Sequence, residues 1–179
     1  MLKERRRNVT GHNAQGRSVV IIDGPPGKTL PRGQGGGLGE IWSALPGPVN
    51  SLAKDDPTQG EVVLSPPAGG HRFRWFAIAP EDPDEPDDER RRRYEGIFAS
   101  MGATHEQVDT TRHPAMHKTA TIDYIVLLSG EVTLLLDDDE RDLKPFDVVV
   151  QQGTNHAWVN KGKETALLIA VLIDAEIEG

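Results

Sequence analysis

The 179-residue sequence contains no cysteine, which excludes disulfide bridges, thiolate nucleophiles and cysteine-ligated zinc from any account of its function. It also lacks an apolar run long enough to span a membrane, so we expect no membrane partner. The formal net charge of -8 argues against a uniformly basic surface, and we expect no nucleic-acid partner. The four arginines at 90–93 are a local exception, and such blocks of charge are mostly solvated helix faces.

The basic start, MLKERRRN, is not followed by the apolar segment that a secretory signal requires, so we expect a cytoplasmic protein. Glycine and proline are plentiful, at 19 and 13 residues. This composition favours short strands joined by many turns over long helices.

The first part of the chain carries strand and turn signals. Apolar or alternating runs predict strands at 18–23, 40–45 and 71–79. The GPPGKT stretch at 24–29 is two residues too short for a phosphate-binding loop, and no helical pattern follows it. We interpret it as a turn.

Two further segments of this region have a distinctive composition. Residues 31–39 are rich in glycine and are expected to form a flexible loop. A helix is predicted near 88–101, because acidic residues precede it and four apolar residues then recur at helical spacing. Those four residues are Tyr94, Ile97, Phe98 and Met101.

The last third of the chain changes to strand signals alone. Five short apolar runs separated by turn residues predict an all-β barrel or sandwich. We therefore divide the chain into an N-terminal extension, 1–105, which packs on a barrel core, 106–179. The predicted core strands are 121–128, 131–136, 147–151, 156–160 and 165–173.

Polar side chains gather at one end of two of these strands. Alternate residues of an extended chain share a face, so His117 and Asp123 lie on one side, and His156 and Trp158 share a side on a later strand. A barrel wall that is polar at one end and apolar deeper forms a small-molecule pocket. The residues expected in this pocket are His113, Thr119, Thr121, Ile125, Trp158 and Asn160.

His117, Asp123 and His156 are the candidate catalytic residues. Two imidazoles and a carboxylate would suit a divalent metal such as Fe, Mn, Ni or Zn. The same cluster is also consistent with an ordinary hydrogen-bond network, in which Asp123 accepts from Thr121 or from a backbone amide. The residues alone leave both interpretations open.

Two stretches keep the spacing of known motifs. Asp123 stands six residues before Gly130, where the first cupin motif places its acid. Gly153, His156 and Asn160 keep the spacing G-x2-H-x3-N of the second cupin motif. In these residues the chain resembles the cupin family.

The resemblance covers about residues 110–175 and implies an all-β cupin double-stranded β-helix, or jelly-roll barrel, and a homodimer. It also implies a divalent metal held by His117, Asp123 and His156. The sequence departs from the family pattern at Thr119, which replaces the second motif histidine, and in having Asp where the motif has Glu. Either His113 supplies a further ligand, or metal binding is reduced to three ligands or lost.

Three functions follow from this resemblance. The first is a metal-dependent enzyme on a small organic substrate, of the oxygenase, isomerase, lyase or decarboxylase type. The second is a metal-free dehydratase, cyclase or isomerase that uses His and Asp as acid and base. The third is a non-catalytic module that binds a small ligand. Trp42, Trp75 and Phe76 are either dimer-interface residues or ordinary core aromatics.

Overall fold

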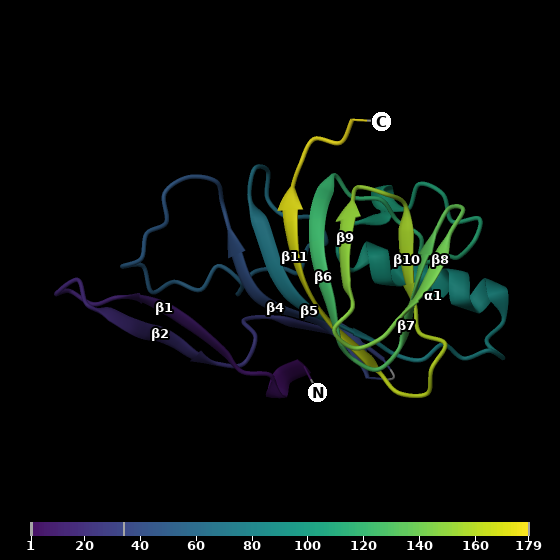
Figure 1. Cartoon of the computed structure of the whole chain (residues 1–179), viewed down its shortest axis with the longest axis horizontal. Coiled ribbons are helices and arrows are strands. Elements are labelled where there is room, and N and C mark those ends of the chain that lie inside the picture. Colours follow the sequence, from purple (N-terminus) through teal and green to yellow (C-terminus); the bar gives the residue numbers. More distant parts are fainter. Residues whose placement is uncertain (1, 34, 179) are drawn as a thin grey trace.

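The computed structural model describes residues 2–33 and 35–178, and antiparallel strands dominate it (Figure 1). One α-helix, α1 (Asp87–Ala99), and two short 3-10 turns, Leu2–Glu4 and Thr104–Glu106, accompany the strands. None of these helices is long and apolar enough to cross a membrane. In chain order the strands are β1 (Arg7–His12), β2 (Ser18–Gly24), β3 (Thr29–Arg32), β4 (Gly36–Ala44), β5 (His71–Ile78), β6 (Thr121–Ser129), β7 (Val132–Leu136), β8 (Glu140–Leu143), β9 (Val148–Gln152), β10 (His156–Val159) and β11 (Ala166–Asp174).

The strands form two facing sheets and a separate hairpin. The larger sheet has the order β3-β4-β5-β11-β6-β9, and the smaller has the order β10-β7-β8. The hairpin of β1 and β2 extends away from the two sheets (Figure 1). The predicted all-β class with one short helix is confirmed. The N-terminal region contributes β3, β4 and β5 to the same sheet as the barrel strands, because β5 pairs directly with β11.

Strict alternation along β6, which lies between β11 and β9 in the larger sheet, gives this strand one buried and one exposed side. Asp123 and Ile125 are buried, whereas Tyr124 between them is 49% exposed. A period of two places one side of the strand against the interior and the other against solvent. The buried side packs with β7 and β11 around one core, formed by Ile125, Leu127, Val132, Leu168, Ala170 and Leu172.

The prediction of a flexible loop at 31–39 is wrong. The segment forms the end of β3, a tight turn and the start of β4. Gly33 and Gly35 adopt φ values of 49° and 88°, which residues with a side chain rarely adopt, so the glycines make this turn and do not signal disorder. Leu38 is fully buried and anchors the new strand in the core.

The predicted core strands are all present, but β8 was not among them. Its sequence, Glu-Arg-Asp-Leu, carries three charges and has no apolar alternation. It pairs only with β7, at the edge of the smaller sheet, where charged side chains remain in solvent.

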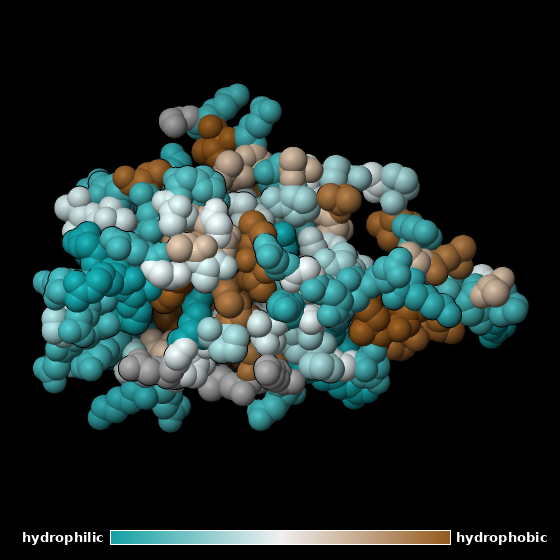
Figure 2. Space-filling model, turned by 180° about the vertical axis from the view of Figure 1, so that it is seen from behind, coloured by the Kyte–Doolittle hydropathy of each residue, from teal (hydrophilic) through white to brown (hydrophobic). Residues whose placement is uncertain are grey.

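The helix predicted near 88–101 is present as α1, and it ends two residues earlier than expected. It has acidic residues in its first turn, which suits the helix dipole. Its apolar side packs on the larger sheet, since Phe98 and Met101 cluster with Leu38 and Leu64. Seen from behind, the surface on the side of α1 is largely hydrophilic (Figure 2).

Candidate functional site

A cavity of about 410 Å³ lies between α1 and the inner faces of the barrel strands. Such a volume, with mostly apolar walls and a few polar groups, is typical of a site for a small organic molecule. Tyr94, Ile97 and Phe98 on the apolar side of α1 close one side of the cavity. The main apolar wall residues are Phe76, Ile97, Phe98, Ile125, Trp158 and Leu168.

Six of the nine residues predicted for the site line this cavity, and three do not. His113, Thr121 and Asn160 lie outside the lining. The six that the fold brings together around the cavity are His117, Thr119, Asp123, Ile125, His156 and Trp158.

His117 and His156 face one another across an isolated β-bridge. Each backbone N–H donates to the other residue's carbonyl over 2.9 Å, although the two residues are far apart in sequence. The pairing places the ring centroids 4.3 Å apart. Phe98 and Trp158 flank the two rings at centroid distances of 5.0 and 5.7 Å. The histidine pair is therefore held between aromatic walls.

Backbone carbonyls fix the orientation of both imidazoles. His117 Nδ1 lies 2.9 Å from the carbonyl oxygen of Ala115, and His156 Nδ1 lies 3.0 Å from that of Thr154. Because a carbonyl can only accept, each Nδ1 must carry the proton when the ring is neutral. Each Nε2 is then left with a free lone pair. Asp123 makes neither contact.

Both imidazoles are neutral at physiological pH. Burial, together with the neighbouring His156, lowers the pKa of His117 to about 3. Burial likewise lowers the pKa of His156 to about 4. A neutral imidazole with a free lone pair is a proton acceptor or a ligand.

Asp123 is a buried carboxyl group with one unused oxygen. It is 5% exposed, and its Oδ1 has no hydrogen-bond partner among the described residues. Burial raises its pKa to about 6, against the opposing effects of the Thr121 hydroxyl and the Arg74 charge. Thr119 and Thr121 share a hydrogen bond of 2.7 Å beside it. Asp123 is therefore a group that can carry a proton near neutral pH.

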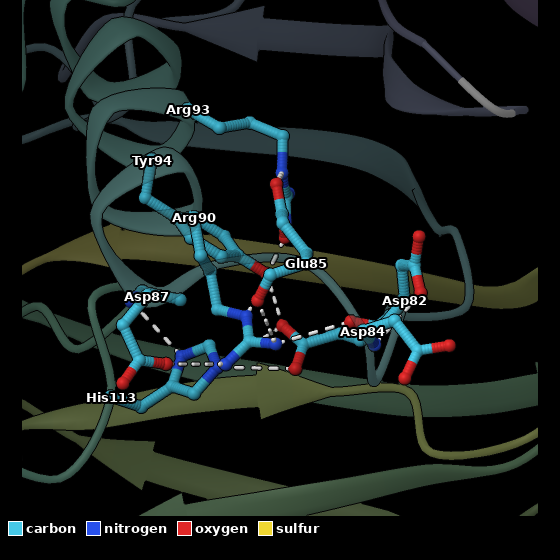
Figure 3. A network of polar contacts seen from close by, with 10 residues as sticks. Asp82, Asp84, Glu85, Asp87, Arg90, Arg93, Tyr94 and His113 are labelled. Atoms are coloured by element: carbon cyan, nitrogen blue, oxygen red, sulfur yellow. Dashed lines mark hydrogen bonds and ion pairs between the residues drawn. The ribbon is translucent and has the colours of Figure 1, made fainter.

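A polar network at the rim ties α1 to the barrel (Figure 3). The Tyr94 hydroxyl donates to Glu81 over 2.7 Å, and His113 Nε2 lies 3.1 Å from the same carboxylate. Burial alone would raise the pKa of Glu81, but these hydrogen bonds bring it below its usual value. Arg93 pairs with Glu85 and covers the Tyr94 ring at 4.5 Å. His113 thus serves to hold the rim in this structure.

Asn160 is used in holding a loop. Its amide nitrogen donates to the carbonyls of Ile78 and Glu164, each over 2.8 Å, and its oxygen accepts from Gly162 N–H. The residue is fully buried. Both hydrogens of the amide nitrogen, and the amide oxygen, are therefore engaged in holding this loop.

Sequence reasoning missed several residues of the cavity. Arg32, Phe76 and Glu81 come from the N-terminal region, where no motif marked them. The helical stripe of Tyr94, Ile97, Phe98 and Met101 was recognised, but nothing in its spacing indicated which surface it would cover. The one available signal was a cation directly before a glycine-rich run, at Arg32, and it lay in the segment expected to be a loop.

The predicted metal site requires three side chains to converge. In the described part of the chain, no group of three or more His, Asp or Glu residues lies in an arrangement that could hold a metal ion. His117 and His156 offer two adjacent Nε2 atoms, whereas catalytic metal sites commonly use three protein ligands. The described side chains therefore do not make up a full ligand set, and the site of His117, Asp123 and His156 stays a prediction.

Comparisons with known proteins find one matching family model and several similar structures. The family model described as "Cupin domain" matches residues 105–172. A crystal structure of a cupin 2 conserved barrel domain protein from Salinispora arenicola CNS-205 is 15% identical, with a TM-score of 0.42, and the match covers 82% of each chain.

Two curated relatives are more similar in sequence. "Phomopsin biosynthesis cluster protein D" from Diaporthe leptostromiformis is 42% identical over 47% of this chain and 48% of its own length. "Cupin-domain-containing oxidoreductase fogC" from Aspergillus ruber is 33% identical over 94% of this chain and 71% of its own. The chain spans about half, or less, of the length of three of the curated relatives that it matches, protein D among them. The family model and the relative from Aspergillus ruber together show that this chain belongs to the cupin superfamily.

Proposed function

We propose that this protein is an enzyme of a biosynthetic pathway that moves protons on a small, largely apolar organic substrate, as an isomerase, cyclase or dehydratase. The observation that carries the proposal is the pair of neutral imidazoles with free Nε2 lone pairs beside the cavity. The name of the relative from Diaporthe leptostromiformis, a biosynthesis cluster protein, supports the pathway context.

His156 and His117 are the proposed general bases. A substrate C–H or O–H placed in the cavity transfers its proton to an Nε2 atom, while the Nδ1 proton stays on the ring and remains hydrogen-bonded to the backbone carbonyl. Because the two rings are only 4.3 Å apart, one imidazolium would disfavour a second, so a single proton is taken up per turnover.

Asp123 is the proposed acid. Its carboxyl group, with Oδ1 free, returns a proton at a second substrate atom or to a departing hydroxyl. The imidazolium then loses its proton to solvent and the Asp123 carboxylate takes one up, which restores the enzyme. An isomerisation or cyclisation therefore balances without a co-reactant, and a dehydration releases one water. The aromatic walls and α1 exclude bulk water, which strengthens these short electrostatic interactions.

The test is exchange of carbon-bound protons in D2O. A panel of aryl ketones and enones that fit the cavity is incubated with the protein, and deuterium incorporation is followed by proton NMR. We expect exchange of at least one panel member to be about 100-fold faster with the wild type than with His156→Gln or His117→Gln, in line with the usual contribution of a general base. Tyr124→Phe, on the outer face of β6, is the matched control and should leave the rate unchanged.

Exchange at equal rates in the histidine variants, or none with any panel member, would contradict the proposal. Chelation with EDTA is expected to leave the exchange rate unaltered. This arm separates the proposal from a metal-dependent mechanism.

A metal-dependent oxidoreductase is the second candidate. It is supported by the relative named as a cupin-domain-containing oxidoreductase, which aligns with 94% of this chain. Metal analysis of protein purified without chelating resin tests it. A bound divalent metal near one equivalent, lost in His117→Gln and His156→Gln, would favour this candidate, and less than about a tenth of an equivalent would reject it.

A further inference from the structure

The cavity contains one guanidinium group for which the described residues supply no counter-ion. Arg32, at the end of β3, lines the cavity wall near the turn of Gly33 and Gly35. Its Nη2 donates to the Met101 sulfur over 2.6 Å, and its buried Nε has no partner among the described residues. A thioether is a weak acceptor and carries no charge.

The other buried arginines are treated differently. Arg74 pairs with Glu40 at 2.8 Å and donates to the carbonyls of Leu64 and Val63. Arg7 pairs with Asp56 and also donates to the carbonyls of Pro25 and Ile41. Arg74 and Arg7 thus have carboxylate and carbonyl acceptors, although the Nε of Arg74 also lacks a partner, whereas Arg32 has no oxygen acceptor among the described residues.

Arg93 and Glu81, two further charged groups of the cavity, are satisfied within the protein, whereas Asp123 keeps one free oxygen. Arg93 is held by Glu85, and Glu81 by Tyr94 and His113. Burial and the charge of Arg74 lower the pKa of Arg32 to about 10, so the group stays cationic at neutral pH. A half-buried cation without an acceptor is costly unless something else supplies the negative charge.

We propose that Arg32 binds a carboxylate group of the substrate, so that the cavity takes small aromatic or otherwise apolar carboxylic acids. This inference rests on the proposed function in placing the substrate in the same cavity. The acid group lies at Arg32, the apolar body lies along Phe76, Phe98 and Trp158, and the reacting atoms reach His117 and His156.

A carboxylate fits this place better than a phosphate. The planar guanidinium fork offers parallel N–H donors, which match the two oxygens of a carboxylate. One cation neutralises one negative charge, whereas a phosphate ester would bring nearly two into an apolar cavity that already holds the carboxyl group of Asp123. The single charge of Arg32 therefore favours a monoanion.

Paired probes test the assignment through binding alone. The protein, dialysed against EDTA, is titrated by calorimetry with 2-naphthoate and with 2-naphthamide, which share shape and differ in charge. We expect the wild type to bind the acid at least about tenfold more tightly than the amide, the ratio that one charge-assisted hydrogen-bonded pair supplies. Arg32→Met should reduce the ratio to about twofold or less, and Arg32→Lys should keep part of it.

Arg90→Met is the matched control, because Arg90 is half-buried on α1, pairs with Glu85 and does not line the cavity. It should keep the tenfold ratio. Equal binding of acid and amide by the wild type, binding of neither probe, or an unchanged ratio in Arg32→Met would overturn the assignment. Failure of the proposed proton transfer would show instead in the deuterium exchange of the histidine variants, which does not depend on this ratio.

Discussion

Two polar side chains at opposite ends of β10 differ in how many of their hydrogen-bonding groups are used. Asn160, just after its end, makes three hydrogen bonds and is fully buried. His156, at its start, uses one ring nitrogen on a backbone carbonyl and leaves the other free beside the cavity. Both residues belong to the same cupin motif spacing. One end of the strand is thus used to hold the fold, and the other is free for the ligand chemistry that we propose.

The largest effect on stability is expected from removing the hydrogen-bonded side chain of Asn160. Asn160→Ala leaves two buried carbonyls and one N–H without partners, so we expect a loss of about 3–5 kcal/mol in the free energy of unfolding. His156→Gln loses one hydrogen bond and should cost only about 1 kcal/mol. Urea unfolding at pH 7.5 measures both. Equal costs, or a cost below about 1 kcal/mol for Asn160→Ala, would contradict the division.

Asp123 allows the cost of a buried charge in the cavity to be measured. Its pKa is raised to about 6 by burial, so the folded state is favoured by protonation and loses stability as the pH rises through 6. Asp123→Asn removes this cost and should raise the free energy of unfolding by about 2 kcal/mol at pH 8. At pH 4 the gain should vanish. A variant less stable than the wild type at pH 8 would show that the carboxylate is stabilised by contacts that we have not identified.

The histidine pair predicts a loss of stability in acid. The pKa values of His117 and His156 are lowered to about 3 and 4, whereas an unfolded histidine titrates near 6.5. As the pH falls below 6.5 the unfolded chain therefore binds protons that the folded chain does not. Each histidine should cost about 1 kcal/mol between pH 7.5 and 5.5. Urea unfolding in EDTA measures this, and His156→Gln should shrink the pH effect by about that amount; an unchanged pH effect would refute the shift.

The smallest expected effect lies away from both ends of β10. Phe146, in the turn before β9, has a φ of 75° and is 78% exposed. A non-glycine residue in this region is strained, and its exposed ring contributes little packing. Phe146→Gly should therefore raise the free energy of unfolding by about 0.5–1 kcal/mol in urea. Destabilisation would mean that the ring makes a contact, for example with a second copy of the chain.

The strands that alternate clearly were predictable from the sequence, and so was the orientation of Asp123 and Tyr124 along β6. Period-two burial is a local property and needs no knowledge of the partner strand. β8 escaped prediction because an edge strand with three charges has no apolar pattern. The turn at Gly33 and Gly35 was mistaken for a flexible loop because composition alone does not distinguish left-handed turns from disorder.

The site divides in the same way. Motif spacing pointed to Asp123 and His156, and strand alternation pointed to His117; all three line the cavity. The sequence could not show that α1 would close the cavity or that Arg32 would reach it, because both depend on long-range packing of the N-terminal region on the barrel. Asn160 shows the limit of motif spacing, since its side chain holds a loop outside the cavity.

The claim that His117 and His156 present free Nε2 lone pairs to the cavity is tested most directly by their tautomeric states. These can be measured from the nitrogen-15 chemical shifts of the side chains in the intact protein at pH 7. We predict that both rings are neutral, with Nδ1 protonated and Nε2 carrying the lone pair. Imidazolium signals, or protons on Nε2 of both rings, would contradict the claim that this end of β10 presents two proton acceptors to a ligand.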